Sequence, residues 1–133
     1  MDSLKVGATG EARLVVGTND TAPRVGSGRI AVLATPVMIS LIEEAALAAV
    51  EDLLPEGKQS LGTHLDVSHV APTPIGMTVE ARAELTAIEG TRLVFQVEAR
   101  DSGGVVGEGR HERVVVTEAS FVARVAEKAA SIT

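Results

Sequence analysis

The chain has 133 residues, of which 12 are Lys or Arg and 18 are Asp or Glu, so its formal net charge is −6. This length suits one domain spanning residues 1–133, and the acidic balance argues against nucleic acid or an anionic lipid surface as a partner. The sequence contains no cysteine, which excludes disulfides and thiolate chemistry. Residues 1–5 lack a signal-peptide pattern, and no run of about 20 apolar residues follows, so we expect a cytoplasmic protein.

The first two predicted elements are a strand at residues 11–18 and a long helix at residues 36–54. Thr35 is suited to cap this helix, Pro36 suits its first turn, and the residues from Pro55 to Gly57 end it. Apolar residues occur nearly all the way around the helix, which indicates that it is buried on most sides.

Period-two alternation predicts further strands, and an amphipathic pattern predicts a short C-terminal helix. The strands lie at residues 61–71, 79–87, 93–100 and 105–117, and the helix at residues 118–130. Glu89-Gly90 and the residues from Asp101 to Gly104 are hairpin turns, so the sheet is antiparallel with one apolar face to be covered. One such sheet around one long helix predicts an α+β protein with a hot-dog fold.

Two adjacent acids, Glu43 and Glu44, lie in the middle of the predicted central helix. A buried carboxylate costs several kcal/mol unless it is paired, hydrogen-bonded or neutralised. Thr35 and Glu43 are separated by about two turns and about 80° around the helix, so both can face one cleft. The alternative is that both acids lie on a strip facing solvent or a second subunit.

His69 shares a strand face with Leu65 and Val67, and that face should point toward the central helix. A single histidine in this position is either a satisfied core residue or a catalytic group. An acid, an imidazole and a hydroxyl are together the groups that acyl transfer needs, as base or nucleophile, proton carrier and oxyanion donor.

The stretch from Gly107 to Arg113 contains two glycines followed by His111 and Arg113 on one strand face. It is not a phosphate loop, because no Lys-Ser/Thr and helix follow, and it is not a zinc motif, because Val115 occupies the place of the second histidine. Arg113 has two equally favoured roles, a structural salt bridge or a ligand contact. The three histidines have no short metal-binding spacing, so we expect no metal site.

Several stretches together resemble the fluoroacetyl-CoA thioesterase-like hot-dog family. The similarity runs from about residue 33 to the C-terminus, and its most specific segments are Ala34-Thr35 with Met38 and Glu43, Ser60-Leu61-Gly62-Thr63, residues 67–79 and residues 107–113. The fluoroacetyl-specific enzyme of this family has a longer, phenylalanine-bearing lid before the central helix. Here the corresponding residues 22–30 form a short segment without an aromatic side chain.

The resemblance implies a homodimer with acyl-CoA sites at the interface between subunits. It places the family's catalytic threonine, glutamate and histidine on Thr35, Glu43 and His69. It also implies that the Gly62 backbone positions the thioester or the water, that Arg113 lies close to the site, and that CoA enters only as part of the substrate, with no separate cofactor.

Our leading hypothesis is a thioesterase that hydrolyses a small or medium acyl-CoA to the free acid and CoA. Glu43 would act as the attacking carboxylate or as the base for water, and Thr35 as a hydrogen-bond donor or as the nucleophile. The alternatives are a non-catalytic dimer that binds acyl-CoA or another apolar ligand, and a hydratase or dehydratase. With only 2% aromatic residues the core is modest, so we expect a dimer or a dimer of dimers.

Overall fold

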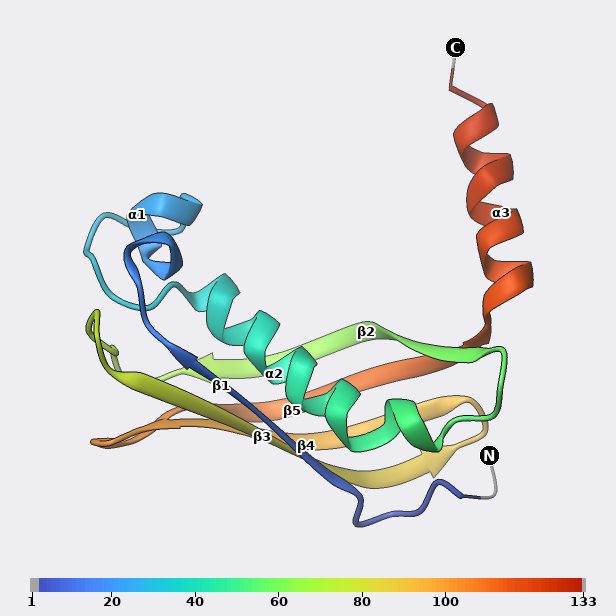
Figure 1. Ribbon diagram of the computed structural model, residues 1–133, viewed down its shortest axis with the longest axis horizontal. Helices are drawn as coiled ribbons and strands as arrows, with labels where there is room; N and C mark the ends of the chain where they lie inside the picture. Colours follow the sequence, from blue (N-terminus) through green and yellow to red (C-terminus); the bar gives the residue numbers. More distant parts are fainter. Residues whose placement is uncertain (1–2, 133) are drawn as a thin grey trace.

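A long helix, α2 (Thr35–Val50), lies against the concave face of a curled five-stranded antiparallel sheet (Figure 1). The computed structural model describes residues 3–132. Across the sheet the strands follow the order β1 (Thr9–Val15), β3 (Thr78–Glu89), β4 (Arg92–Asp101), β5 (Gly104–Thr117) and β2 (Lys58–His69). The α+β hot-dog fold is therefore confirmed.

The central helix begins and ends differently from the prediction. Thr35 is its first residue, Ala34 occupies the N-cap position, and no side chain caps the helix, so the expected capping role of Thr35 is wrong. The regular helix stops at Val50 and continues as a 3-10 turn, η2 (Glu51–Leu53), before Pro55. The predicted end at residue 54 therefore included this turn.

The other elements keep their predicted order with shifted ends. β1 lies two to three residues earlier than predicted, β2 begins earlier at Lys58, and α3 (Glu118–Ala130) has the predicted bounds. Two short elements between β1 and α2 were not predicted, η1 (Thr18–Asp20) and α1 (Ala22–Val25). They have three and four residues, which is too short for a periodic pattern.

The core lies between α2 and the concave face of the sheet. It is built almost entirely from Val, Leu, Ile, Met and Ala, with Phe95 as its aromatic side chain. Helix and sheet approach each other closely at Gly10 of β1, where an added Cβ would lie 2.2 Å from the carbonyl oxygen of Ala45. Ser40, Glu44 and Ala48 are exposed, so one side of α2 faces solvent.

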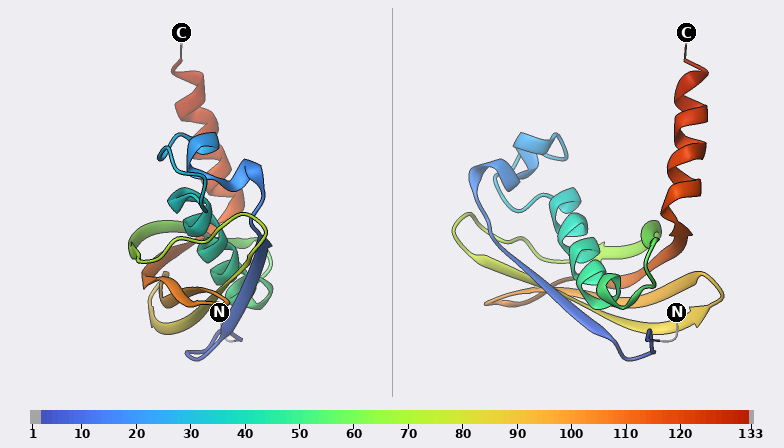
Figure 2. Two further views of the ribbon diagram at one scale, coloured as in Figure 1. Left: turned by 90° about the vertical axis from the view of Figure 1, so that its left-hand side faces the viewer. Right: turned by 45° about the vertical axis from the view of Figure 1, so that its right-hand side comes forward.

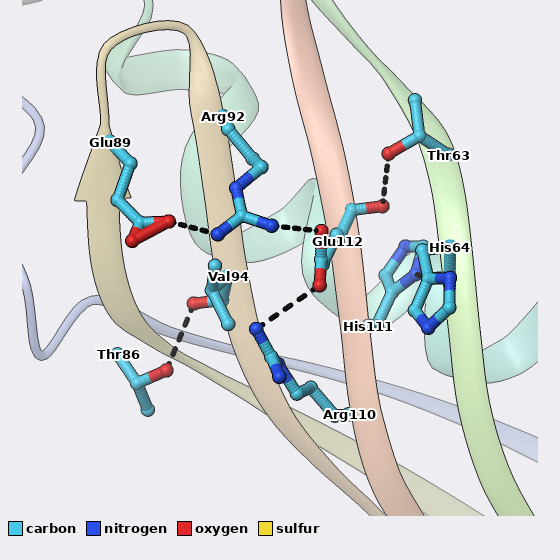
Figure 3. Close-up of polar contacts among 9 residues, drawn as sticks. All are labelled: Thr63, His64, Thr86, Glu89, Arg92, Val94, Arg110, His111 and Glu112. Carbon is cyan, nitrogen blue, oxygen red and sulfur yellow. Dashed lines mark hydrogen bonds and ion pairs between the residues drawn. The ribbon is translucent and has the colours of Figure 1, made fainter.

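A β-bulge divides β2 into two halves. Gly62 pairs with Arg113 and His64 with Glu112, so Thr63 is an extra residue in the ladder, and its hydroxyl donates to the carbonyl of Glu112 at 3.3 Å (Figure 3). Without the bulge, Gly62 and His69 would lie on opposite faces, because they are an odd number of residues apart. The bulge brings both to the concave face, beside α2.

Two surfaces near β2 have no partner within the described chain. β2 is the last strand of the sheet and carries the exposed side chains Leu61 and Leu65. α3 follows β5 and projects away from the sheet, with no buried residue, as Figure 2 shows from two sides. No helix within residues 3–132 is both long and apolar enough to span a bilayer.

Candidate active site

Thr35 and His69 meet at the N-terminal end of α2. Thr35 opens the helix, His69 is the last residue of β2, and Oγ1 of Thr35 lies 2.7 Å from Nδ1 of His69. The strand face predicted for His69 is confirmed, because Leu65, Val67 and His69 alternate on the concave side of β2, where Val67 packs against the core and Leu65 at the sheet edge stays exposed. The hydroxyl of Thr35 thus pairs with an imidazole instead of capping the helix.

The second ring nitrogen of His69 has no partner. Nε2 is buried and makes no hydrogen bond to any residue of the described chain. Burial lowers the pKa of His69, so the neutral imidazole is favoured near pH 7. The pair borders a cavity of about 270 Å³ whose remaining walls come from residues between 22 and 33 and from residues 70–72.

Glu43, Gly62 and Arg113 form a second group of side chains further along α2. Oε2 of Glu43 lies 3.7 Å from Nη1 of Arg113, and the Glu43 side chain keeps 39% of its exposure. A Cβ added to Gly62 would lie 2.5 Å from the same Glu43 oxygen, so a larger residue at position 62 would displace this carboxylate. Arg113 makes an ion pair, which was one of its two expected roles, and the other role, a ligand contact, stays a prediction. Glu44 is exposed and borders a different cavity, beside Arg13 and Leu14 of β1.

The structure therefore brings the five predicted site residues together as two groups. Thr35 is about 12 Å from Glu43 along the helix axis, at about 1.5 Å per residue. Gly62 is about 20 Å from His69 along β2, because six ladder steps of about 3.3 Å separate them when the bulge residue Thr63 is not counted. Both groups lie on the concave side of the sheet, one at each half of β2.

Three polar residues behind Arg113 were not assigned to the site by the sequence analysis. Ser60 and Glu51 hold one side of its guanidinium and His111 the other. Ser60 and His111 are buried, and a buried polar side chain on a strand is hard to separate from a solvent-facing one by alternation alone. The sequence pattern places His111 on the same strand face as Arg113 and predicts no further role for it. Among residues 3–132, no group of His, Asp and Glu is arranged to hold a metal ion.

Comparison with known proteins gives one consistent result. Residues 16–119 match the model of the family described as fluoroacetyl-CoA-specific thioesterase. A fluoroacetyl-CoA thioesterase from Streptantibioticus cattleyicolor is 43% identical over 97 residues, which are 73% of this chain and 70% of that protein.

Solved structures agree with the sequence relationship. A structure of the fluoroacetyl-CoA thioesterase FlK superposes with a TM-score of 0.88 at 36% identity, covering 94% of this chain and 97% of that one. A hot-dog-like protein from Thermanaerovibrio acidaminovorans has a TM-score of 0.87 at 27% identity, covering 96% and 94%. A thioesterase superfamily member from Thermus thermophilus gives 0.84 at 27% identity, covering 96% and 97%.

Proposed function

The chain belongs to the family of fluoroacetyl-CoA-specific thioesterases and is an acyl-CoA thioesterase, and we propose that it cleaves the thioester with Thr35, His69 and Glu43. The observation that carries this assignment is the contact of 2.7 Å between Oγ1 of Thr35 and Nδ1 of His69. A hydroxyl held against an imidazole is the arrangement of an activated oxygen nucleophile and its base.

The unpartnered nitrogen of His69 indicates where a catalytic carboxylate would bind the imidazole. When the Thr35 hydroxyl donates to Nδ1, the neutral imidazole carries its hydrogen on Nε2. A buried donor without an acceptor costs about 1–3 kcal/mol, and Nε2 has no acceptor within the described chain. A carboxylate placed there satisfies the donor and stabilises the imidazolium that forms during the reaction. We assign this place to Glu43.

Glu43 reaches His69 only from a second subunit. Within one chain the two groups are separated by about 12 Å of helix, at about 1.5 Å per residue. β2 is an edge strand, and antiparallel pairing with β2 of a second copy about a two-fold axis at Asp66 puts the partner's Gly62 opposite His69, because Thr63 is an extra residue in the ladder. The partner's Glu43 lies against the partner's Gly62 and therefore comes to the same place. Each dimer then has two sites, each built from both chains.

The reaction proceeds by acyl transfer to Thr35 and then to water. Oγ1 of Thr35 forms a bond to the thioester carbon while its proton passes to Nδ1 of His69. The carbon–sulfur bond breaks, and the CoA thiolate takes that proton. A water molecule then attacks the acyl-threonine ester and gives its proton to His69. The carbon–oxygen bond breaks, Thr35 regains the proton, and the free acid leaves. No cofactor beyond the CoA of the substrate is required.

Mixed dimers test this assignment. Glu43→Gln and His69→Ala are each expected to lose activity as homodimers. Two differently tagged chains, co-expressed and purified through both tags, give a heterodimer in which one of the two sites is intact. We expect about half of the wild-type kcat per dimer, because one site in two contains all three groups. A heterodimer as inactive as its parents would place all three groups in one chain, and a doubly tagged Glu43→Gln homodimer is the control.

The substrate we propose is a small acyl-CoA. The FlK structures concern a fluoroacetyl-CoA thioesterase, whereas here the cavity beside Thr35 is bordered by the short segment 22–33, which has no aromatic side chain. We therefore expect acetyl-CoA and its short homologues to be hydrolysed as well as fluoroacetyl-CoA, in the cytoplasm. Release of free thiol across a series of acyl-CoA substrates measures this. Binding without thiol release indicates a binding module, and loss of enoyl absorbance without thiol release indicates a hydratase.

A further inference from the structure

Behind Glu43 lies a buried polar network that the reaction described above does not use. Ser60 is 4% exposed, Arg113 4% and His111 0%. A buried guanidinium is costly unless good geometry and further hydrogen bonds compensate for its lost hydration. We therefore expect the guanidinium of Arg113 to be hydrogen-bonded to its neighbours, and these contacts determine how it is oriented.

Arg113 is fixed on three sides. Its Nε donates to Oγ of Ser60 at 2.9 Å, and its Nη2 donates to the carbonyl of Ser60 at 3.0 Å. Its Nη1 faces both Nε2 of His111, at 3.2 Å, and Oε2 of Glu43, at 3.7 Å. Because the guanidinium is planar, the two contacts to Ser60 determine which way Nη1 points.

Glu51, the first residue of η2, holds Ser60. The hydroxyl of Ser60 donates to Oε2 of Glu51 at 2.9 Å, and the backbone N–H of Ser60 donates to Oε1 at 3.2 Å. The single hydroxyl proton is thereby committed to Glu51, which leaves a lone pair of Oγ facing Nε of Arg113. Arg113 thus lies between two carboxylates, Glu43 on α2 and Glu51 just after it.

His111 completes the network from the other side. Its Nδ1 lies 2.8 Å from the carbonyl oxygen of His64, and because a carbonyl only accepts, Nδ1 carries the hydrogen. Nε2 of the neutral ring then accepts from Nη1 of Arg113. Figure 3 shows His111 on β5 beside His64 on β2, while Glu112 contacts Arg92 and Arg110 on the outer face.

We propose that Glu51 is a positioning residue that acts through Ser60 and Arg113 to orient the carboxylate of Glu43 for catalysis. The inference rests on the proposed role of Glu43 in thioester hydrolysis. Glu51 touches neither the substrate nor Glu43. Its effect is to fix the guanidinium, so that Nη1 attracts one oxygen of Glu43 and leaves the other for the reacting groups.

The test is the effect of Glu51→Gln and Ser60→Ala on turnover. We expect each to lower kcat about tenfold and to change KM little, because the acyl-CoA contacts remain while a catalytic group loses its orientation. The double variant should be no slower than either single variant, because both changes break one chain of contacts. Asp52→Asn is the matched control, since Asp52 is the next residue of η2 and is exposed. It should keep wild-type kcat.

The Glu43→Gln background separates this inference from the proposed function. There, Glu51→Gln should cause no further loss of the residual rate, because its action passes through Glu43. If Glu43→Gln is inactive while folded Glu51→Gln and Ser60→Ala keep wild-type kcat, the positioning role is wrong and the proposed function stands. If Glu43→Gln itself keeps wild-type activity, the proposed site is wrong. Circular dichroism and thermal melting identify variants that have lost their fold.

Discussion

Thr35 and His69 are 34 residues apart in the chain, yet Oγ1 of one lies 2.7 Å from Nδ1 of the other. The contact joins the first residue of α2 to the last residue of β2. The N-terminus of α2 lies beside the C-terminus of β2, so the arrangement of these two elements brings the two side chains into contact. Predictions about the hydroxyl therefore test the site most directly.

Thr35→Ala removes the hydroxyl and should lower kcat by about 100-fold, the lower end of what is expected for loss of a positioned catalytic group. Thr35→Ser keeps a hydroxyl in contact with His69 and should retain most of the activity. Thr35 is exposed and caps nothing, so both variants should melt near the wild-type temperature. Thiol-release kinetics with acetyl-CoA measure the difference, and equal activity of both variants would contradict the role of Thr35.

Substitution of the two adjacent acids of α2, Glu43 and Glu44, should affect turnover very differently. Glu43→Gln should lose about 100-fold or more in kcat, because an amide cannot act as the carboxylate partner of an imidazolium. Glu44→Gln should keep most of its activity, because Glu44 is exposed and faces the cavity beside β1. The two changes are chemically identical and adjacent in sequence, so each is the control for the other. The reverse ranking would exclude the proposed site.

The fold was predictable because its signals are local. Alternation marked the strands after residue 60, and the run of apolar residues in the helix identified the element that the sheet surrounds. The ends of α2 were not predictable. Leu53 and Leu54 continue the apolar pattern although the helix has already ended at Val50, and the hydroxyl of Thr35 is used by a residue far away in the sequence.

The site was predictable only in part, for a physical reason. Gly62 and His69 lie on one face because Thr63 is an extra residue in the ladder, and no alternation pattern reveals such an insertion. Glu51 lies inside the predicted helix over residues 36–54, where its sequence context does not distinguish it from a solvent-facing acid, yet it binds Ser60 and, through Ser60, positions Arg113. Such contacts depend on where the end of α2 lies relative to β2, which the sequence pattern does not specify.

An added methyl group at Gly62 should impair catalysis more than folding. The Cβ of Gly62→Ala would lie 2.5 Å from Oε2 of Glu43, and the flexible carboxylate would have to move. We expect kcat to fall by about tenfold or more, in line with loss of a positioned carboxylate. Gly17→Ala is the control, because its Cβ meets only Oδ2 of Asp20 at 3.4 Å, an ordinary contact. Comparable activity of the two variants would contradict the placement of Glu43.

Stability should fall as the pH drops below about 6.5, the ordinary pKa of histidine. Burial is the main cause that lowers the pKa of His111, with the Arg113 cation adding to it, and burial also lowers the pKa of His69. The unfolded chain therefore takes up these protons before the folded one, so the stabilisation is complete above pH 6.5 and is lost as the pH falls toward the folded-state pKa values. Urea unfolding at a series of pH values below and above 6.5 measures this loss of stability.

His111→Gln should flatten this dependence, because the buried group that must stay neutral is gone. The free energy of unfolding of this variant will be lower at every pH, so the relevant quantity is how steeply that free energy changes with pH. His64→Gln is the matched control, because the His64 side chain is exposed and only its carbonyl contacts His111. A wild-type slope in His111→Gln would show that His111 does not carry the effect.

A charge on the free edge of β2 should break the dimer, whereas the same charge on the other edge of the sheet should not. Leu65 lies on β2 and is 41% exposed, and Val15 lies on β1 at the opposite edge and is 61% exposed. Pairing of β2 with its counterpart would bury Leu65 beside the two-fold axis, so Leu65→Lys brings two cations together there and opposes association. We expect sedimentation to show a monomer with little thioesterase activity for Leu65→Lys, and an active dimer for Val15→Lys. A monomeric wild-type protein, or an active Leu65→Lys monomer, would show that Glu43 and His69 do not meet across this edge.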